Sequence, residues 1–158
     1  MAFKEACEYL SQFGFEARVT VFEQSSATVE LAANALGCEP EKIAKTMSFL
    51  LENTPILIVT AGDVKIDNKK YKNYFKQKAK LIPYDLVENY IGHQPGGVCP
   101  FGIKEKVPVY LDFSLKRFKK IYPACGSENS AVALTPTELA SCLKDSKWID
   151  VCTEGKAF

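Results

Sequence analysis

The sequence lacks any apolar run long enough to cross a membrane. Its longest such run, residues 55–61, is far shorter than the roughly 20 residues that a transmembrane helix needs. The first residues also lack the basic start and the apolar segment of a secretory signal peptide. These absences argue against a membrane protein and predict a soluble protein located in the cytoplasm.

The patterns that usually accompany metal or nucleotide chemistry are missing as well. The chain has no Cys-x-x-Cys pair, no His-Glu-x-x-His, no Walker loop and no serine elbow, and His93 is its single histidine. We therefore expect no metal site and no cofactor. The six cysteines are at least ten residues apart, which favours free and mostly buried thiols: Cys7, Cys38, Cys99, Cys125, Cys142 and Cys152.

The composition is that of an ordinary globular domain. Apolar residues make up 47% and charged residues 25% of the 158 positions, which is enough for a core and atypical of a disordered chain. No repeat, low-complexity tract or Pro/Gly/Ser linker divides the chain. We therefore expect a single domain that spans residues 1–158.

Helices are expected where apolar residues recur at helical spacing between a capping residue and a glycine. The clearest start is Thr135-Pro-Thr-Glu138, a capping box with proline at the first helical position. The pattern predicts helices at 3–13, from a cap within 25–28 to 36, at 67–75, at 85–91 and at 135–143, with short helical turns at 40–45 and 114–118.

Strands are expected in short β-branched or apolar runs between turn residues. These runs are 17–22, 46–51, 56–60, 107–111, 121–124, 131–134 and 148–151. The runs 46–51 and 56–60 predict a hairpin whose four-residue connection is not one of the tightest turns. Because many neighbouring strands have no crossover helix between them, we expect an α+β fold with a mixed, largely antiparallel central sheet surrounded by helices.

The formal net charge is +1, but the charges are unevenly placed along the chain. Residues 55–120 hold thirteen basic and six acidic residues, whereas the segments before and after them are acidic. Nearly all of these basic residues are lysines, which suits attraction to backbone phosphates better than reading of bases. The alternative is a solvated helix face. The candidate RNA contacts are Lys69, Lys70, Lys72 and Lys76.

The most unusual segment is the loop at 92–102, which has four glycines and two prolines. Glycines let backbone N–H groups converge on one space, where they can bind a phosphate or a carbonyl oxygen. The alternative is a tight connector after a helix. The number of glycines exceeds what a connector needs, which favours a functional loop.

Lys45 and the pair His93 and Cys99 are further candidates for chemistry. Lys45 lies between a short helix and an apolar strand, where a lysine either extends to solvent or is held at the edge of a site. His93 and Cys99 would form a nucleophilic pair only within hydrogen-bond reach of each other. The alternative, a surface histidine and a loop cysteine, is the more common case for such a spacing.

Three motifs, in this order, resemble the YbaK family, which includes free-standing relatives of the editing domain inserted in bacterial prolyl-tRNA synthetases. Lys45-Thr46 before an apolar strand resembles the Lys-Thr motif of that family. The segment from Gly96 to Pro100 resembles its GxxxP loop. Residues 124–127 and 131–139 resemble its closing turn, strand and helix. The similarity extends over nearly the whole chain.

The resemblance implies a partly barrel-like fold and a cytosolic deacylase that hydrolyses mischarged tRNA, most often tRNA for proline, without a metal or a covalent enzyme nucleophile. Lys45 would bind the terminal phosphate or the carbonyl region, and backbone N–H groups of the loop would stabilise the oxyanion. Mischarged aminoacyl-tRNA and prolyl-tRNA synthetase are the implied partners. The implied catalytic positions are Lys45, Gly96, Gly97, Val98, Cys99 and Pro100, and the implied substrate-binding positions are Phe22, Thr46, Gly126 and Ser127.

Two positions depart from the branch of the family that is specific for cysteinyl-tRNA. That branch has a tyrosine near Phe22 and an aspartate near Ala131. The preferred amino acid therefore stays open among Cys, Ala, Ser and Thr. The missing carboxylate at Ala131 also supports an alternative hypothesis, a non-catalytic tRNA- or RNA-binding module of the same fold.

Overall fold

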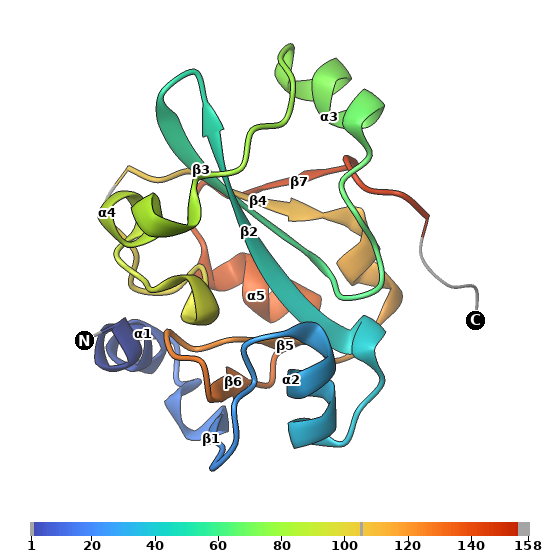
Figure 1. Cartoon of the computed structure of the whole chain (residues 1–158). Coiled ribbons are helices and arrows are strands. Elements are labelled where there is room, and N and C mark those ends of the chain that lie inside the picture. The colour runs from blue at the N-terminus through green and yellow to red at the C-terminus, as the bar shows by residue number, and fades with distance from the viewer. Residues whose placement is uncertain (1, 105, 155–158) are drawn as a thin grey trace.

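A five-stranded sheet forms the centre of the computed structural model, which describes residues 2–104 and 106–154 (Figure 1). The end positions 1 and 158 of the expected domain lie outside these residues. The strand order is β5-β2-β3-β4-β7, and a separate two-stranded sheet pairs β1 with β6. The strands are β1 (Val19–Val21), β2 (Ile43–Leu51), β3 (Thr54–Ala61), β4 (Val109–Asp112), β5 (Tyr122–Pro123), β6 (Ser130–Val132) and β7 (Lys147–Ile149).

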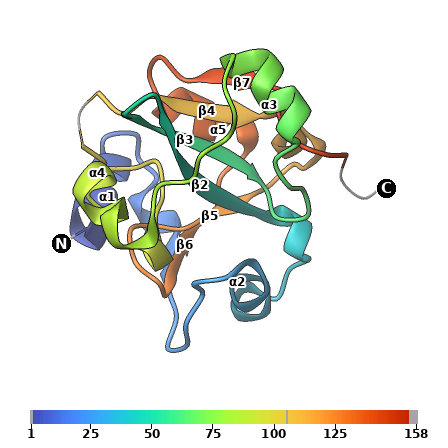
Figure 2. The same ribbon diagram turned by 45° about the horizontal axis from the view of Figure 1, so that its top comes forward.

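Helices surround this sheet, as two views of the ribbon show (Figures 1 and 2). The α-helices are α1 (Ala2–Ser11), α2 (Val29–Leu36), α3 (Asn68–Phe75), α4 (Val87–Ile91) and α5 (Pro136–Cys142). Single 3₁₀ turns connect other elements: η1 (Glu16–Arg18), η2 (Pro40–Lys42), η3 (Tyr84–Leu86), η4 (Pro95–Gly97) and η5 (Phe113–Arg117). The expected single-domain α+β fold is confirmed.

The helix starts follow the capping residues of the sequence. Thr28 accepts a hydrogen bond from the Leu31 N–H, and Asp67 accepts bonds at the start of α3. Thr135 and Glu138 form both halves of the expected capping box. Each of these side chains satisfies a backbone N–H that has no partner within its own helix, which is why local sequence predicts these boundaries well.

The pairing of the strands differs in part from the expected, largely antiparallel sheet. The long hairpin of β2 and β3 and the β1–β6 pair are antiparallel. The three other pairs, β2–β5, β3–β4 and β4–β7, are parallel. A parallel pair needs a crossover connection, and long stretches containing helices join β3 to β4 and β4 to β7. Short strands so far apart in the sequence carry no local signal of their direction.

The turn of the β2–β3 hairpin is shorter than the sequence predicted. Leu51 pairs with Thr54, so only Glu52 and Asn53 connect the strands. Pro55 lies within β3 and pairs with Leu50, whereas the prediction placed Pro55 in the connection and began the strand at residue 56. Proline is tolerated there because β4 pairs with β3 only from Leu57 onward, which leaves the other side of β3 without a ladder at Pro55.

The hydrophobic core lies on both sides of β3. All residues from Ile56 to Ala61 are buried, as expected for a strand covered on both faces. On the side of α3, the ring of Tyr71 lies 5.3 Å from the ring of Phe49 on β2. Both side chains belong to a large cluster that also joins the sheet to α1 and α5. This rigid centre fixes the start of β2, from which the candidate site is built.

Candidate active site

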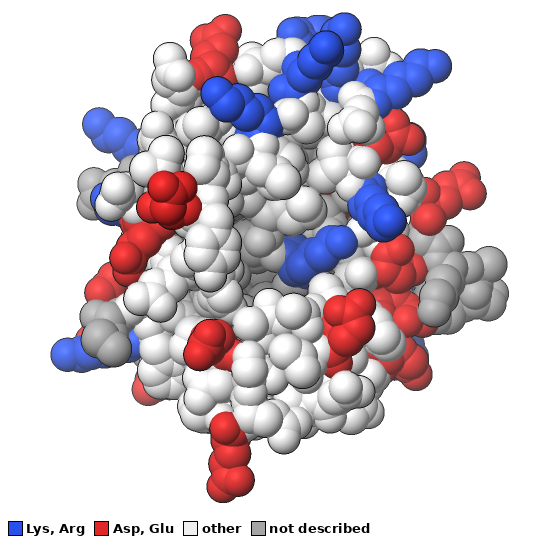
Figure 3. Space-filling view, viewed as in Figure 1, with Lys and Arg blue, Asp and Glu red and all other residues white. Residues whose placement is uncertain are grey.

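A cavity of about 280 Å³ opens beside the start of β2, between α2, the η4 loop and strands β5 and β6. The space-filling view shows a hollow in the middle of this face, with basic side chains beside it (Figure 3). Four of the expected site residues line the cavity together: Lys45, Thr46, Gly96 and Val98. The other described residues that line it are Ser26, Ala27, Thr28, Val29, Ala32, Ile43, Ala44, Met47, Pro95, Tyr122, Ala124, Ser130 and Ala131.

Lys45 is half-buried at the edge of this cavity. The sequence placed it at the end of a short helix, but η2 ends at Lys42 and β2 already begins at Ile43, so Lys45 lies within the strand opposite Thr60. Its ammonium group donates a hydrogen bond of 2.5 Å to the carbonyl of Val64. An ammonium group has three N–H donors, so two remain for a ligand.

Burial lowers the pKa of Lys45, and nearby acidic groups, led by Cys152 and Asp63, oppose this shift. Asp63 forms a two-contact ion pair with Arg117, at 2.6 and 3.1 Å. This pair stabilises the turn that carries Val64, the partner of Lys45. The lysine is therefore anchored at its head group as well as along its stem.

Thr46, which also lines the cavity, has an unsatisfied hydroxyl. Its Oγ1 is buried and has no hydrogen-bond partner among the described residues. A buried hydroxyl without a partner costs free energy, which a polar ligand group in the cavity would recover.

The η4 loop presents two backbone N–H groups that are not already used. Gly97 donates to the carbonyl of Gln94 (2.9 Å) and Cys99 donates to Nδ1 of His93 (3.3 Å). The N–H groups of Gly96 and Val98 have no partner within residues 2–104 and 106–154. The expected set of N–H donors from Gly96 to Cys99 is therefore reduced to these two.

Gly97 holds the loop against the turn that precedes β6. A Cβ atom at Gly97 would lie only 2.7 Å from Cα of Ser127 and 2.8 Å from its backbone N and C atoms. Only glycine, which has no Cβ, allows the two backbone segments to approach this closely. Gly97, Gly126 and Ser127 line a second cavity of about 390 Å³, which shares Gly96 with the first.

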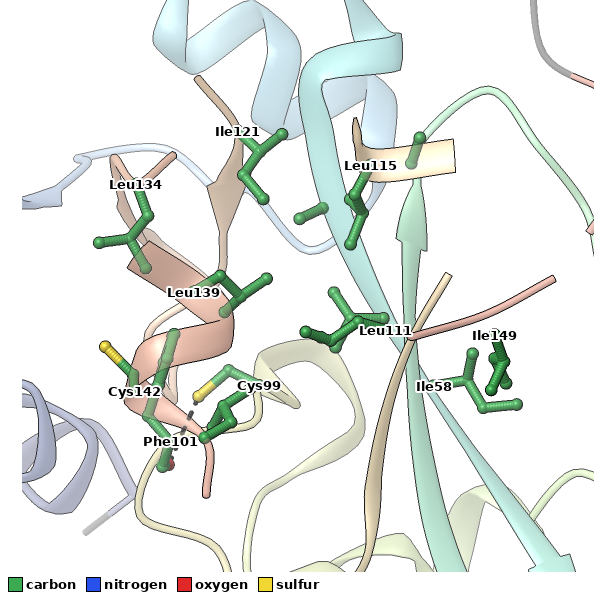
Figure 4. Close-up of a cluster of buried hydrophobic side chains, with 14 of the residues drawn as sticks. Ile58, Cys99, Phe101, Leu111, Leu115, Ile121, Leu134, Leu139, Cys142 and Ile149 are labelled. Carbon is green, nitrogen blue, oxygen red and sulfur yellow. Dashed lines mark hydrogen bonds between the residues drawn. The ribbon is translucent and has the colours of Figure 1, made fainter. Parts of the chain in front are cut away.

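Cys99 and His93 do come together, but in the core rather than at the cavity. The thiol of Cys99 lies 3.8 Å from Nδ1 of His93, and both residues are fully buried. Figure 4 shows the thiol among apolar side chains, with its bond to the carbonyl of Phe101 dashed. Burial raises the pKa of Cys99 to about 12 and lowers the pKa of His93. Both groups are neutral near pH 7, which does not suit a nucleophilic pair.

Two other expected residues do not line the first cavity. Pro100 is buried and lines a separate cavity beside Tyr9 and Phe13. Phe22 exchanges hydrogen bonds with Asn129, its N–H donating to the carbonyl (2.7 Å) and its carbonyl accepting from the amide (3.0 Å). Its contribution is therefore to hold the turn at residues 126–130 rather than to form a wall of this cavity.

The structure adds Ser130, Tyr122 and Met47 to the wall of the cavity, and no sequence pattern had indicated them. Ser130 belongs to an ordinary Gly-Ser-Glu-Asn-Ser turn, and Tyr122 and Met47 resemble other residues of short strands. Their position depends on pairing between β1 and β6 and between β2 and β5, which are distant in the sequence.

The lysines of α3, and Lys76 directly after it, do not line the cavity. Lys69, Lys72 and Lys76 are exposed, while Lys70 pairs with Asp150 (3.2 Å). Lys70 also donates to the carbonyl of Cys152 (2.9 Å), the residue whose thiol influences Lys45. Figure 3 shows basic side chains at the top of this face, where α3 lies in Figure 1.

No group of three or more His, Cys, Asp or Glu side chains in residues 2–104 and 106–154 could hold a metal ion. No helix in this part of the chain is both long enough and apolar enough to span a membrane. All six cysteines are free thiols.

Comparison with known sequences identifies related proteins. The model of the aminoacyl-tRNA editing domain family matches residues 23–142. The uncharacterized protein YwhH of Bacillus subtilis (strain 168) is 49% identical over 155 residues, which cover 98% of this chain and 99% of YwhH. A proline–tRNA ligase of Limosilactobacillus fermentum is 32% identical over 112 residues, or 66% of this chain, but these span only 20% of the ligase.

Comparison with solved structures confirms the fold. A crystal structure described as a candidate trans-editing enzyme for prolyl-tRNA synthetase superposes with a TM-score of 0.86 at 25% identity. The superposition covers 97% of this chain and 98% of that protein. The hypothetical protein APE2540 has the same fold, with a TM-score of 0.79 at 24% identity over 92% of this chain and 99% of that one.

Proposed function

The chain belongs to the aminoacyl-tRNA editing domain family, and from this premise we propose that it is a trans-editing deacylase, which hydrolyses the ester bond between a tRNA and a wrongly attached amino acid. The observation that carries the proposal is the cavity that combines Lys45 with the unused N–H groups of Gly96 and Val98. In this arrangement a cation lies at the same cavity as two N–H groups, which could both donate hydrogen bonds to one carbonyl oxygen.

The reaction needs water, the ester and a place for negative charge. Water attacks the carbonyl carbon of the ester, and the carbonyl oxygen becomes an oxyanion. The bond to the ribose oxygen then breaks, and that oxygen takes up the proton that the water loses. The products are the free amino acid and the tRNA with its terminal hydroxyl. The N–H groups of Gly96 and Val98 would stabilise the oxyanion, because fixed donors need no reorientation when charge develops.

Lys45 would bind the phosphate of the terminal adenosine or the carbonyl region of the substrate. Its bond to Val64 fixes the head group, and its two remaining N–H donors are free for an oxygen ligand. Thr46 could add its unpartnered hydroxyl. In this role Lys45 positions the ester between itself and the η4 loop.

The proposed substrate is tRNA for proline that carries a small, uncharged amino acid such as Cys, Ala, Ser or Thr. The described lining includes no carboxylate, and Lys45 is its only charged side chain, which disfavours a positively charged side chain on the attached amino acid. Prolyl-tRNA synthetase is the proposed source of the mischarged tRNA, since both a solved structure of this fold and several relatives are associated with that enzyme.

The acceptor stem would lie over α3. Lys69, Lys72 and Lys76 are exposed there, and attraction between lysines and phosphates needs no base contact. Lys70 is partly committed to Asp150 and Cys152, so we expect it to contribute less than its neighbours.

The test of the proposed function is a deacylation panel. The purified chain is incubated with tRNA for proline charged with Ala, Cys, Ser, Thr or Pro. We expect release of at least one of the small amino acids well above the uncatalysed rate, and little release of proline.

The panel also tests a second candidate function, in which the chain is a non-catalytic tRNA-binding module of the same fold. The observation in its favour is Ala131, which leaves the described cavity lining without a carboxylate. Salt-dependent tRNA binding without hydrolysis of any member of the panel would establish this second candidate and contradict the first.

Cys99→Ala is expected to change kcat for deacylation by less than about twofold, because the thiol points into the core and its burial keeps it protonated. Loss of a buried side chain should cost about 0.5–3 kcal/mol of stability. Rates are therefore measured well below the Tm of the variant. A loss of activity by a hundredfold in folded Cys99→Ala would instead indicate a thiol mechanism.

A further inference from the structure

A chain of hydrogen bonds runs from Phe22 to Ser130 through two side chains. The amide nitrogen of Asn129 donates to the carbonyl of Phe22 (3.0 Å), and the hydroxyl of Ser127 donates to Oδ1 of Asn129 (3.0 Å). The hydroxyl oxygens of Ser127 and Ser130 lie 2.6 Å apart. This series of hydrogen bonds thus ends at Ser130, which lines the cavity.

The direction of every bond in this chain follows from its first acceptor. A carbonyl oxygen can only accept, so Asn129 must turn its NH₂ group toward Phe22 and its oxygen toward Ser127. Ser127 uses its single proton on that oxygen, so Ser130 must donate to Ser127. The hydroxyl of Ser130 then has lone pairs but no proton for any other partner, and it can only accept.

The surroundings of Ser130 indicate which kind of donor it can accept from. Ser130 is 1% exposed, so water does not compete freely for its lone pairs. Lys45 is the only charged side chain among the described lining residues, so no carboxylate forms part of that lining. The carboxylate of Glu128 lies just outside it, with Oε2 3.6 Å from the position that a Cβ would take at Gly96.

The hydroxyl of Thr46 has no partner and can either donate or accept, so it does not select charge. Ser26 also lines the cavity, and its hydroxyl donates to the carbonyl of Glu128 (3.2 Å), so it too can only accept. Of these two hydroxyls that can only accept, Ser130 is the one on a fully buried residue.

We infer that Ser130 accepts a hydrogen bond from the α-ammonium group of the aminoacyl ester, an inference that rests on the proposed function. Every aminoacyl-tRNA carries this group, whatever its side chain. Repulsion from Lys45 favours the same orientation, with the ammonium group directed away from the lysine. The site would thereby recognise aminoacyl esters with a free α-amino group and discriminate against esters that lack it.

The experiment compares two non-hydrolysable probes, 3′-alanylamino-3′-deoxyadenosine and 3′-propionylamino-3′-deoxyadenosine, which differ only in the α-ammonium group. Their Kd values are measured by calorimetry for the wild-type chain and for variants. Because hydrogen bonds to charged groups are strong, we expect the wild type to bind the alanyl probe about tenfold more tightly. This preference should decline as the pH rises above about 8, where α-amino groups lose their proton.

Two variants and one control complete the design. Ser130→Ala should reduce the preference to less than about twofold and abolish its pH dependence. Ser127→Ala should also reduce it, because Ser130 then loses the acceptor of its proton and can turn that proton toward the ligand. Ser25→Ala is the control, since Ser25 is exposed, bonds to Glu128 of the same turn and does not line the cavity. It should leave the preference unchanged.

The outcomes separate this inference from the proposed function. A wild-type preference that persists in folded Ser130→Ala, or an equal loss for both probes, would overturn the role of Ser130. These binding data do not depend on catalysis. A wild-type chain that fails the deacylation panel while Ser130→Ala loses the preference would overturn the deacylase proposal and leave the ammonium site in place.

Discussion

Lys45→Ala is expected to lower kcat/KM for deacylation by about 10²–10³-fold, the usual effect of removing one donor that stabilises developing charge. The head group of Lys45 is held by Val64 at the edge of the cavity, so its position is fixed before substrate binds. Loss of this cation should impair both the positioning of the ester and the stabilisation of the negative charge that forms on it.

The stability of the variant is the first control on this result. Lys45 is half-buried and burial lowers its pKa, which means that the charged form is disfavoured in the folded chain. Lys45→Met keeps the apolar stem without the charge, so we expect a Tm equal to or above that of the wild type. The same loss of activity in Lys45→Met as in Lys45→Ala would assign the effect to the ammonium group.

Lys42→Ala is the matched control for charge. Lys42 lies three residues earlier, is more exposed and pairs with Glu39 at 2.9 Å on the surface. Its loss should change kcat/KM by less than about twofold, because exposed pairs of this kind contribute little. Activity above half of the wild-type value in folded Lys45→Met would refute the role proposed for Lys45.

Gly97→Ala is expected to reduce activity about 100-fold and to destabilise the chain. A methyl group at Gly97 would lie 2.7 Å from Cα of Ser127, so one of the two backbone segments must move. Overpacking of this kind costs about 1–3 kcal/mol, and for a chain of this size that lowers Tm by roughly 2–12 °C. A displacement of about 1 Å at the neighbouring N–H donors is enough to cause a loss of that order in rate.

Gly96→Ala is the matched control for the structural part of this prediction. A methyl group there would make ordinary contacts, at 3.4 Å from Cβ of Glu128 and 3.5 Å from Cβ of Ala27. Its Tm should therefore stay close to that of the wild type. Equal Tm values for Gly97→Ala and the wild type would show that the loop does not depend on its close approach to Ser127.

Local features of the fold were predictable from the sequence because their causes are local. The capping box at Thr135 and Glu138 and the N-cap at Thr28 each involve residues a few positions apart. The parallel direction of β4 and β7 was not predictable, since it depends on crossovers of many residues. The two-residue turn at Glu52 was missed because Thr54 and Pro55 were assigned to the connection rather than to the second strand.

For the candidate site, the sequence indicated residue types but not their surroundings. Lys45 and the loop glycines could be proposed from motifs, and the structure places Lys45, Gly96 and Val98 at one cavity. The burial of Cys99 and the position of Ser130 follow from packing between segments far apart in the chain, which no single window of sequence contains. Their chemistry could therefore be argued only from the fold.

The separation of charge along the chain has a consequence for how a tRNA would arrive. The net charge is only +1, yet basic side chains gather over α3 while acidic side chains predominate on the opposite part of the same face (Figure 3). Such a molecule has a dipole moment, which exerts a torque on an approaching polyanion even where the net attraction is weak. The encounter would be oriented before contact, and the small net charge would allow rapid dissociation after hydrolysis.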